Sequence, residues 1–308
     1  MQIVDQRETA ARLPASKLIA ALEQMFVEGC EVPLRQSHKI ESASGESDGT
    51  LLLMPAWQKG RRLGVKTVSI YPNNRSRGLP GLHSTYILFD AETGAPLAML
   101  DGDTITSRRT AAASALAARY LSRADASTLL LLGSGRVGSL IPEAYTAVRP
   151  IQKVMVWDID SNSAASLVEN LNHAGMVATV TTDLECAVAQ ADVVSCATLS
   201  MSPLIHGKWL RPGTHLDLIG GFTPTMRESD NDCYVGTSVF IDTDEALAKA
   251  GDLLEPIKAG VFQKGAVCAR LEQLCRKEHP GRKANDEITL FKAVGTALED
   301  LAAACTAM

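Results

Sequence analysis

The sequence predicts an α/β protein with two parts, a doubly wound parallel sheet and a smaller α+β domain that precedes it. Between residues 127 and 245, short apolar runs alternate with helical patterns, as they do in a parallel sheet covered by helices. A glycine-rich turn follows the first of these runs. The earlier residues instead combine an amphipathic helix with separate strand-like segments.

Composition limits the class of protein. With 308 residues, 46% of them hydrophobic, the chain can bury a full core, and its length suggests about two domains. The net charge of −5 argues against nucleic-acid binding. The seven cysteines are scattered without a Cys-x-x-Cys pair, as expected for reduced thiols. The sequence shows neither a signal-peptide pattern nor an apolar run of membrane-spanning length, so we expect a cytoplasmic protein without a membrane partner.

The first part, residues 1–122, begins with an amphipathic helix and continues in strands. We expect a helix over 14–27, strands near 51–54, 63–70, 84–89 and 97–100, a turn over 90–96 and an alanine-rich helix over 106–121. The polar segment 41–49 is predicted to be a hairpin tip. These elements predict an α+β substrate domain joined to the second part by the alanine-rich helix.

The second part, residues 123–285, has the repeated strand and helix pattern. Its predicted strands are 128–132, 153–157, 177–180, 193–197, 215–219 and 239–242, and Asp183 is expected to cap a helix. Residues 286–308 are predicted to form a final helix that returns to the first domain.

The glycine turn indicates a dinucleotide site. Gly133 would permit the tight turn, Gly135 the approach of a pyrophosphate, and Gly138 the close packing of the next helix. After the second strand come Asp158, Ile159 and Asp160, at about the distance expected for a ribose-binding acid.

An acid here repels a 2′-phosphate, which favours NAD(H) over NADP(H). NADP(H) stays open because Arg136 in the turn could reach a phosphate. A glycine turn without a ligand is the structural alternative.

Two cations stand out for chemistry. Lys66 lies within an apolar strand, where an ammonium is costly to desolvate unless it reaches the surface. Arg109 lies in the first turn of the alanine-rich helix, a position that suits the binding of an anion, although a solvated arginine pair with Arg108 is the alternative. The histidines show no metal-ligand spacing, so no metal is expected. His83 is a candidate for the substrate pocket.

These residues together resemble the ornithine cyclodeaminase/μ-crystallin family. The resemblance spans nearly the whole chain and rests on Met54-Pro55, Leu63-Gly-Val-Lys66, Thr106-x-x-Arg109-Thr-Ala-Ala, the glycine turn, Gly220-Gly221 with Arg227-Glu228, and Leu290-Phe-Lys-x-x-Gly295. It implies a Rossmann fold for the second part, and a substrate and homodimerisation domain formed by the first part and the final helix.

The resemblance also implies roles for individual residues. Lys66, Arg109 and Arg35 match the positions that hold a substrate carboxylate. Pattern and resemblance together place the cofactor contacts at Thr110, Gly133, Ser134, Gly135, Arg136, Val137, Asp158, Ile159, Asp160, Thr198, Ile219 and Gly220.

Two departures distinguish activities within the family. Cyclodeaminases carry one carboxylate just after the paired glycines and another shortly before Met-Pro, where this chain has Phe222 and Leu52. Phenylalanine cannot accept a proton, which disfavours ornithine deamination. The segments 81–90 and 222–228 resemble the branch that reduces Δ1-pyrroline-2-carboxylate and Δ1-piperideine-2-carboxylate to L-proline and L-pipecolate.

The expected reaction is an NAD(P)H-dependent ketimine reduction. Arg109, Arg35 and Lys66 would pair with the substrate carboxylate, a hydride would reach C2, and Lys66 would donate the proton to nitrogen. Ornithine cyclodeaminase, a non-catalytic NAD(P)H binder and an alanine or opine dehydrogenase are the alternatives.

Overall fold

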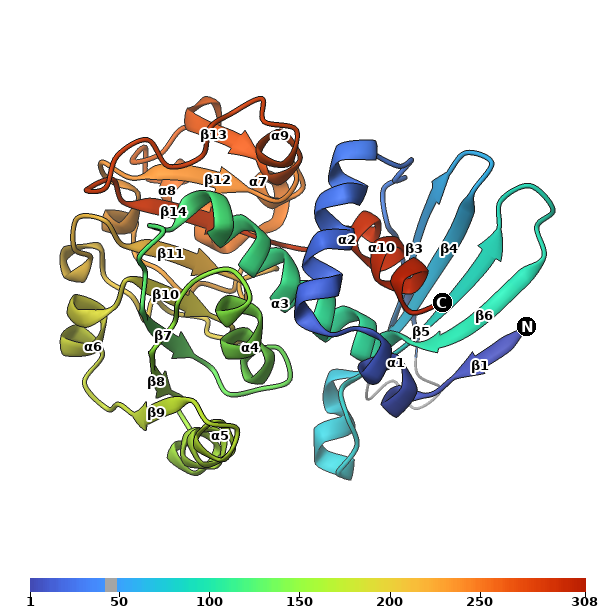
Figure 1. The fold of residues 1–308 in the computed structure, drawn as a ribbon, viewed down its shortest axis with the longest axis horizontal. Coiled ribbons are helices and arrows are strands. Elements are labelled where there is room, and N and C mark those ends of the chain that lie inside the picture. The colour runs from blue at the N-terminus through green and yellow to red at the C-terminus, as the bar shows by residue number, and fades with distance from the viewer. Residues whose placement is uncertain (42–48) are drawn as a thin grey trace. The chain divides into compact units, whose positions relative to one another are not determined.

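The computed structural model describes residues 1–41 and 49–308 and divides into two compact units (Figure 1). Unit 1 comprises Met1–Arg109 and Thr296–Met308, and unit 2 comprises Thr110–Gly295. The division falls inside helix α3 (Gly102–Leu121), and so differs from a boundary after residue 122. The reason is packing, because the Ser114 hydroxyl in the second half of α3 donates a hydrogen bond to Asp217, a residue of the unit 2 sheet.

Unit 1 is built on a mixed sheet whose order, among the described residues, is β1-β6-β5-β4-β3-β2. The strands are β1 (Gln2–Val4), β2 (Gln36–Ile40), β3 (Gly49–Gln58), β4 (Arg62–Ile70), β5 (Leu82–Asp90) and β6 (Pro96–Asp101). Only β1 and β6 pair in parallel; the other described neighbours are antiparallel. The predicted hairpin tip at 41–49 lies, apart from its two end residues, outside the described part of the chain.

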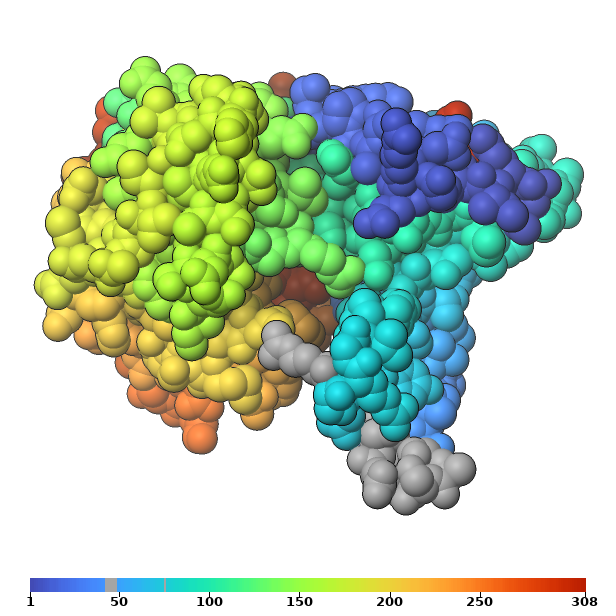
Figure 2. Space-filling view, turned by 90° about the horizontal axis from the view of Figure 1, so that it is seen from below, coloured from blue at the N-terminus to red at the C-terminus, as the bar shows by residue number. Residues whose placement is uncertain are grey.

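Besides the first part of α3, the described residues of this unit form the helices α1 (Gln6–Arg12), α2 (Ala15–Glu28) and α10 (Ala297–Thr306). The N-terminal segment through α2 forms a continuous outer surface of unit 1, shown in blue in Figure 2. Helix α10 packs on α2 and on strands β3, β4 and β5 (Figure 1). Because side chains alternate along a strand, Met54, Lys66, Tyr86 and Leu88 share the buried face of the sheet. The C-terminal helix therefore covers the face that carries Lys66.

Unit 2 contains a parallel sheet with the order β13-β12-β14-β11-β10-β7-β8-β9. The strands are β7 (Thr128–Leu132), β8 (Lys153–Trp157), β9 (Val177–Val180), β10 (Val193–Cys196), β11 (His215–Leu218), β12 (Ser238–Ile241), β13 (Val267–Arg270) and β14 (Thr289–Lys292). The helices are α4 (Ile141–Thr146), α5 (Ser161–His173), α6 (Leu184–Gln190), α7 (Ala246–Lys249), α8 (Gly251–Lys258) and α9 (Leu271–Cys275). The doubly wound parallel sheet is confirmed, and the strand order reverses between β7 and β10, where such sheets bind ligands.

One predicted element is wrong. Residues 286–308 do not form one helix, because Thr289–Lys292 is strand β14 and the helix starts only at Ala297. Strand β14 lies between β11 and β12 in the sheet and is buried along its whole length. A short apolar segment of this kind has no reliable period, so only its neighbours select the strand over the helix.

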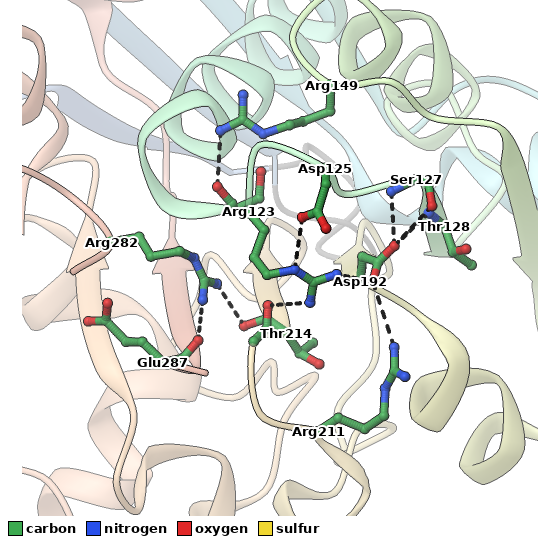
Figure 3. Close-up of polar contacts among 12 residues, drawn as sticks. Arg123, Asp125, Ser127, Thr128, Arg149, Asp192, Arg211, Thr214, Arg282 and Glu287 are labelled. Carbon is green, nitrogen blue, oxygen red and sulfur yellow. Dashed lines mark hydrogen bonds and ion pairs between the residues drawn. The ribbon is translucent and has the colours of Figure 1, made fainter. Parts of the chain in front are cut away.

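The amino ends of the unit 2 strands are joined by an ion network (Figure 3). Asp192, just before β10, accepts hydrogen bonds from the backbone N–H groups of Ser127 and Thr128 at the start of β7. The same carboxylate pairs with Arg123 at 2.7 Å and Arg211 at 3.7 Å. Burial acts to raise the pKa of Asp192, but these donors hold it below its usual value.

Two further arginines, Arg149 and Arg282, hold the end of α3 on this unit, and Figure 3 shows Arg282 with its contacts to Thr214 and Glu287. Arg149 donates to the carbonyl oxygens of Ala118, Arg119 and Ser122, and Arg282 donates to that of Leu121. The last carbonyls of a helix lack partners within the helix, and cations there also complement its dipole. The arginines thus fix α3 at the amino edge of the sheet, away from the carboxyl edge where the glycine turn lies.

Among the described residues, no helix is long and apolar enough to cross a membrane.

Candidate active site

The glycine turn follows β7, and of its three glycines only Gly135 has free space where a side chain would begin. Gly133 has φ +93°, and a Cβ there would lie 2.6 Å from the carbonyl oxygen of Ala197. A Cβ on Gly138 would lie 1.9 Å from the carbonyl oxygen of Gly133. A Cβ on Gly135 would meet nothing within 4 Å. Packing requires two of the glycines, whereas the space beside the third fits the close approach of a pyrophosphate.

These differences predict opposite effects for two matched substitutions. Gly138→Ala is expected to lower the free energy of unfolding by about 1–3 kcal/mol, because its methyl overlaps the backbone of Gly133. Gly135→Ala should leave it within about 0.5 kcal/mol and weaken NADH binding by about tenfold. Urea unfolding and NADH titration measure the two effects. Unchanged NADH affinity in Gly135→Ala would remove this turn from the cofactor site.

The acid after β8 is tied to the same turn. The Asp158 carboxylate accepts hydrogen bonds from the Ser134 backbone and hydroxyl, both at 2.7 Å, and from the Asp160 backbone at 2.9 Å. Burial acts to raise its pKa, yet these donors hold the pKa below its ordinary value, so the group is ionised at neutral pH. Asp158 therefore places a negative charge beside the turn, where a ribose hydroxyl could donate to it.

The two neighbouring candidates are placed differently from Asp158. Asp160 is the N-cap of α5 and accepts hydrogen bonds from the Asn162 backbone and the Ser163 hydroxyl. Ile159 is 92% exposed. Arg136 and Val137 continue the turn, and the helix that follows is short, a 3-10 turn over Gly138–Leu140 and then α4.

The buried Glu228 binds several of the other cofactor candidates through hydrogen bonds. The sequence had suggested no role for this acid. Glu228 accepts hydrogen bonds from the Thr198 backbone (2.7 Å) and hydroxyl (2.8 Å), and from the backbone of Gly220 (2.8 Å) and Gly221 (3.3 Å). Thr198 follows β10, and Gly220 follows β11 and the buried Ile219. One carboxylate thus joins the carboxyl ends of two strands beside the glycine turn. Burial raises the pKa of Glu228 to about 7.

A second buried pair supports this acid. Asp252 accepts hydrogen bonds from the Glu228 and Ser229 backbones and pairs at 3.1 Å with Lys292, the last residue of β14. Both charged side chains are fully buried. The available sequence signal was a lysine in an apolar run, Thr-Leu-Phe-Lys292, because a buried ammonium needs a carboxylate partner.

Unit 1 brings the predicted substrate cations together. Lys66 on β4 is 2% exposed and pairs at 2.6 Å with Asp300, and its ammonium donates to the Thr106 hydroxyl at 3.2 Å. Arg109 on α3 is 6% exposed and pairs with Asp300 at 3.0 Å and with Glu299 at 2.6 Å. Thr110, the next residue of α3, is the first residue of unit 2.

The pKa of Lys66 depends on burial and on these neighbouring charges. Burial lowers the pKa of its ammonium to about 8, against the attraction of Asp300, and the positive charges of Arg109 and Arg35 lower it further. Arg35 is therefore close enough to Lys66 to interact electrostatically with it. Lys66 and Arg109 thus face the two buried carboxylates of Asp300 and Glu299, and Arg35 adds a positive charge that acts on Lys66.

His83 is not part of this cluster. In the β4–β5 register Lys66 lies opposite Tyr86, so His83 is on the other face of the sheet. There it lines an open pocket of about 300 Å³ together with Thr67 and Thr85.

The two positions that depart from cyclodeaminases lie in different units of the structure. Leu52 lies opposite Val68 in the β3–β4 register, on the same face of the sheet as Lys66. Phe222 follows the paired glycines after β11 and is 44% exposed. In the described part of the chain, no group of acids, histidines or cysteines is placed to hold a metal ion.

Comparison with known proteins identifies the family of this chain. A family model described as the ornithine cyclodeaminase/mu-crystallin family matches residues 2–307. The Δ1-pyrroline-2-carboxylate reductase of Colwellia psychrerythraea is 34% identical over 308 residues, which cover 99% of this chain and 97% of the relative.

Solved structures are similar over the whole chain. The reductase of the same name from Thermococcus litoralis, in complex with NADH and L-proline, has a TM-score of 0.92 at 33% identity, covering 100% of this chain and 96% of that one. An archaeal alanine dehydrogenase dimer with bound NAD has a TM-score of 0.90 at 29% identity, covering 100% and 94%. The chain belongs to the ornithine cyclodeaminase/mu-crystallin family.

Proposed function

We propose that this protein reduces cyclic ketimine carboxylates with NADH, converting Δ1-pyrroline-2-carboxylate to L-proline and Δ1-piperideine-2-carboxylate to L-pipecolate. The observation that carries the proposal is the buried ion cluster of unit 1, in which Asp300 and Glu299 hold Lys66 and Arg109 together, while Arg35 adds a positive charge near Lys66. A substrate with a carboxylate would be attracted by these cations. The reductase relatives and the similar structure with NADH and L-proline support this substrate class.

Arg109 is the main contact for the substrate carboxylate. Its guanidinium is planar and always charged, and it can donate two parallel hydrogen bonds to a carboxylate. Glu299 and Asp300 hold it in one orientation from α10. A guanidinium fixed in this way loses little freedom when the substrate binds, so more of the binding energy orients the C=N bond.

Lys66 supplies the proton in this proposal. Reduction of a C=N bond adds one hydride to carbon and one proton to nitrogen, and bound NADH would supply the hydride. With a pKa of about 8, the Lys66 ammonium is mostly protonated at pH 7 and is a better acid than an ordinary lysine. The pKa is lowered mainly because α10 packs on β4 and buries the Lys66 ammonium.

NADH is the preferred cofactor because of Asp158. Its ionised carboxylate would accept hydrogen bonds from a ribose diol but repel a 2′-phosphate. The open position at Gly135 provides the backbone approach that a pyrophosphate needs. The similar structures with NADH or NAD support the same choice.

We also propose a homodimer formed through the face of the unit 1 sheet opposite α10. Pro55, Trp57, Val65, Phe89 and Met99 form an apolar, partly exposed surface on that face. Such patches usually mark an interface. The similar archaeal alanine dehydrogenase is a dimer. Sedimentation should give twice the chain mass for the wild type, and Phe89→Glu should shift it toward the monomer.

We place the reaction in the cytoplasm. All seven cysteines are free, which suits a reducing compartment. Fractionation that recovers the protein with an exported fraction would contradict this placement.

The function is tested by mixing the purified protein with Δ1-pyrroline-2-carboxylate and NADH and following the loss of absorbance of the reduced nicotinamide. Parallel assays use NADPH and Δ1-piperideine-2-carboxylate. Rapid NADH oxidation with formation of L-proline is the expected result. No oxidation of either cofactor, together with ammonia release from L-ornithine and NAD, would replace the proposal with a cyclodeaminase. Cofactor binding without any turnover would indicate a non-catalytic binder.

A further inference from the structure

Asp300 contacts both Lys66 and Arg109. It lies in the first turn of α10 and is fully buried. One of its oxygens lies 2.6 Å from the Lys66 ammonium and the other 3.0 Å from Nε of Arg109. The two cations come from β4 and α3, and α10 comes from the far end of the chain. A carboxylate with one cation on each oxygen fixes the distance between those cations.

The neighbouring acid behaves differently. Glu299 is equally buried and lies in the same helical turn, and it pairs with Arg109 at 2.6 Å. Both acids benefit from the amino end of α10, where the helix dipole favours negative charge. If burial of charge were the only requirement, the two acids would be equivalent. The contacts of Asp300 join the ammonium to the guanidinium.

We propose that Asp300 is a positioning residue that keeps Lys66 protonated and at a fixed distance from Arg109, so that the two cations bind one substrate carboxylate together. This inference rests on the proposed reductase function. Glu299 orients Arg109.

The charges around Lys66 support this role. The groups that face it are Asp300 from α10, Arg109 and the Thr106 hydroxyl from α3, and Arg35 from the segment before β2, while Tyr86 lies opposite it in the β5 register. Burial and the two arginines all lower the pKa of Lys66, and Asp300 raises it. Loss of the Asp300 charge would therefore let Lys66 lose its proton at a lower pH.

The test uses a ligand that does not titrate. Pyrrole-2-carboxylate is planar and has the carboxylate of the substrate, but its ring nitrogen is not basic, so any pH dependence belongs to the protein. Its affinity for the protein saturated with NADH is measured from pH 6 to 10 for the wild type, Asp300→Asn and Glu299→Gln. In the wild type, binding should weaken as pH rises through about 8, because Lys66 loses its proton there.

We call the loss of affinity with rising pH the basic limb. In Asp300→Asn the basic limb should move to lower pH by about one to two units. In Glu299→Gln the affinity should change while the limb stays in place. An unmoved limb in Asp300→Asn, an equal shift in both variants, or failure of the wild type to bind the ligand would overturn the inference. Equal shifts would mean that only total charge matters.

Asp300→Glu keeps the proposal testable if Asp300→Asn does not fold, as judged by thermal melting. It retains the charge but adds one methylene, so the limb should stay near that of the wild type while affinity falls about tenfold. Wild-type affinity in this variant would contradict the positioning role. Turnover of Δ1-pyrroline-2-carboxylate by the wild type is scored separately, so the reductase function and the role of Asp300 can fail independently.

Discussion

Lys66→Met is expected to lower kcat for Δ1-pyrroline-2-carboxylate by about 10²–10⁴-fold, the usual contribution of a positioned general acid. Methionine fills a similar volume in the buried strand but has no proton to donate. Substrate affinity should fall as well, because one of three cations is lost. Steady-state kinetics with saturating NADH separates the two effects through kcat and KM.

Lys66→Arg is the matched control for this substitution. The guanidinium keeps the positive charge, so much of the carboxylate affinity should remain, but it cannot release its proton at working pH. We expect kcat to fall nearly as far as in Lys66→Met, with a smaller rise in KM. If kcat stayed at the wild-type value in Lys66→Met and only KM rose, Lys66 would be a binding residue and the proton would come from elsewhere.

Reversal of the cofactor preference is the second large effect we expect. In Asp158→Ser combined with Ile159→Arg, the carboxylate that repels a 2′-phosphate is replaced and an arginine that can pair with it is introduced at an exposed position. Charge-assisted hydrogen bonds contribute about 1.5–3 kcal/mol each, so the NADPH to NADH ratio of kcat/KM should rise by about 10²–10³.

Asp158→Asn is needed to interpret that result, because Asp158 also holds Ser134 in the glycine turn. Asparagine keeps an oxygen that can accept from Ser134 but removes the charge. It should therefore weaken NADH binding and relieve the repulsion of NADPH while leaving the melting temperature nearly unchanged. A double variant that still prefers NADH would show that Asp158 does not determine the choice, as would a wild type that prefers NADPH.

The cofactor part of the protein could be predicted because its signals are local. The strand before Gly133, the spacing of the glycines and the acid after the next strand all lie within about one βαβ unit, and the conformation of such a unit follows mainly from its own residues. The parallel sheet and the amphipathic helix before residue 28 were predictable for the same reason, namely a clear hydrophobic period.

Other features required the tertiary structure. The sequence placed residues 286–308 in one helix, and only pairing with β11 and β12 shows that Thr289–Lys292 is a strand. His83 and Lys66 appeared to share a pocket, but the strand register puts them on opposite faces of a sheet. A shift of one residue in a strand reverses the face of every side chain, and sequence patterns rarely locate strands to that accuracy.

By itself, the sequence determined the cations, the glycine turn and the acid that favours NADH, because each is a matter of residue type and short spacing. The tertiary structure decided which acid neutralises which cation. Asp300 with Lys66, Glu299 with Arg109 and Asp252 with Lys292 are pairs between distant segments. The energy of a buried ion pair depends on separation and desolvation in space, and no sequence period records either quantity.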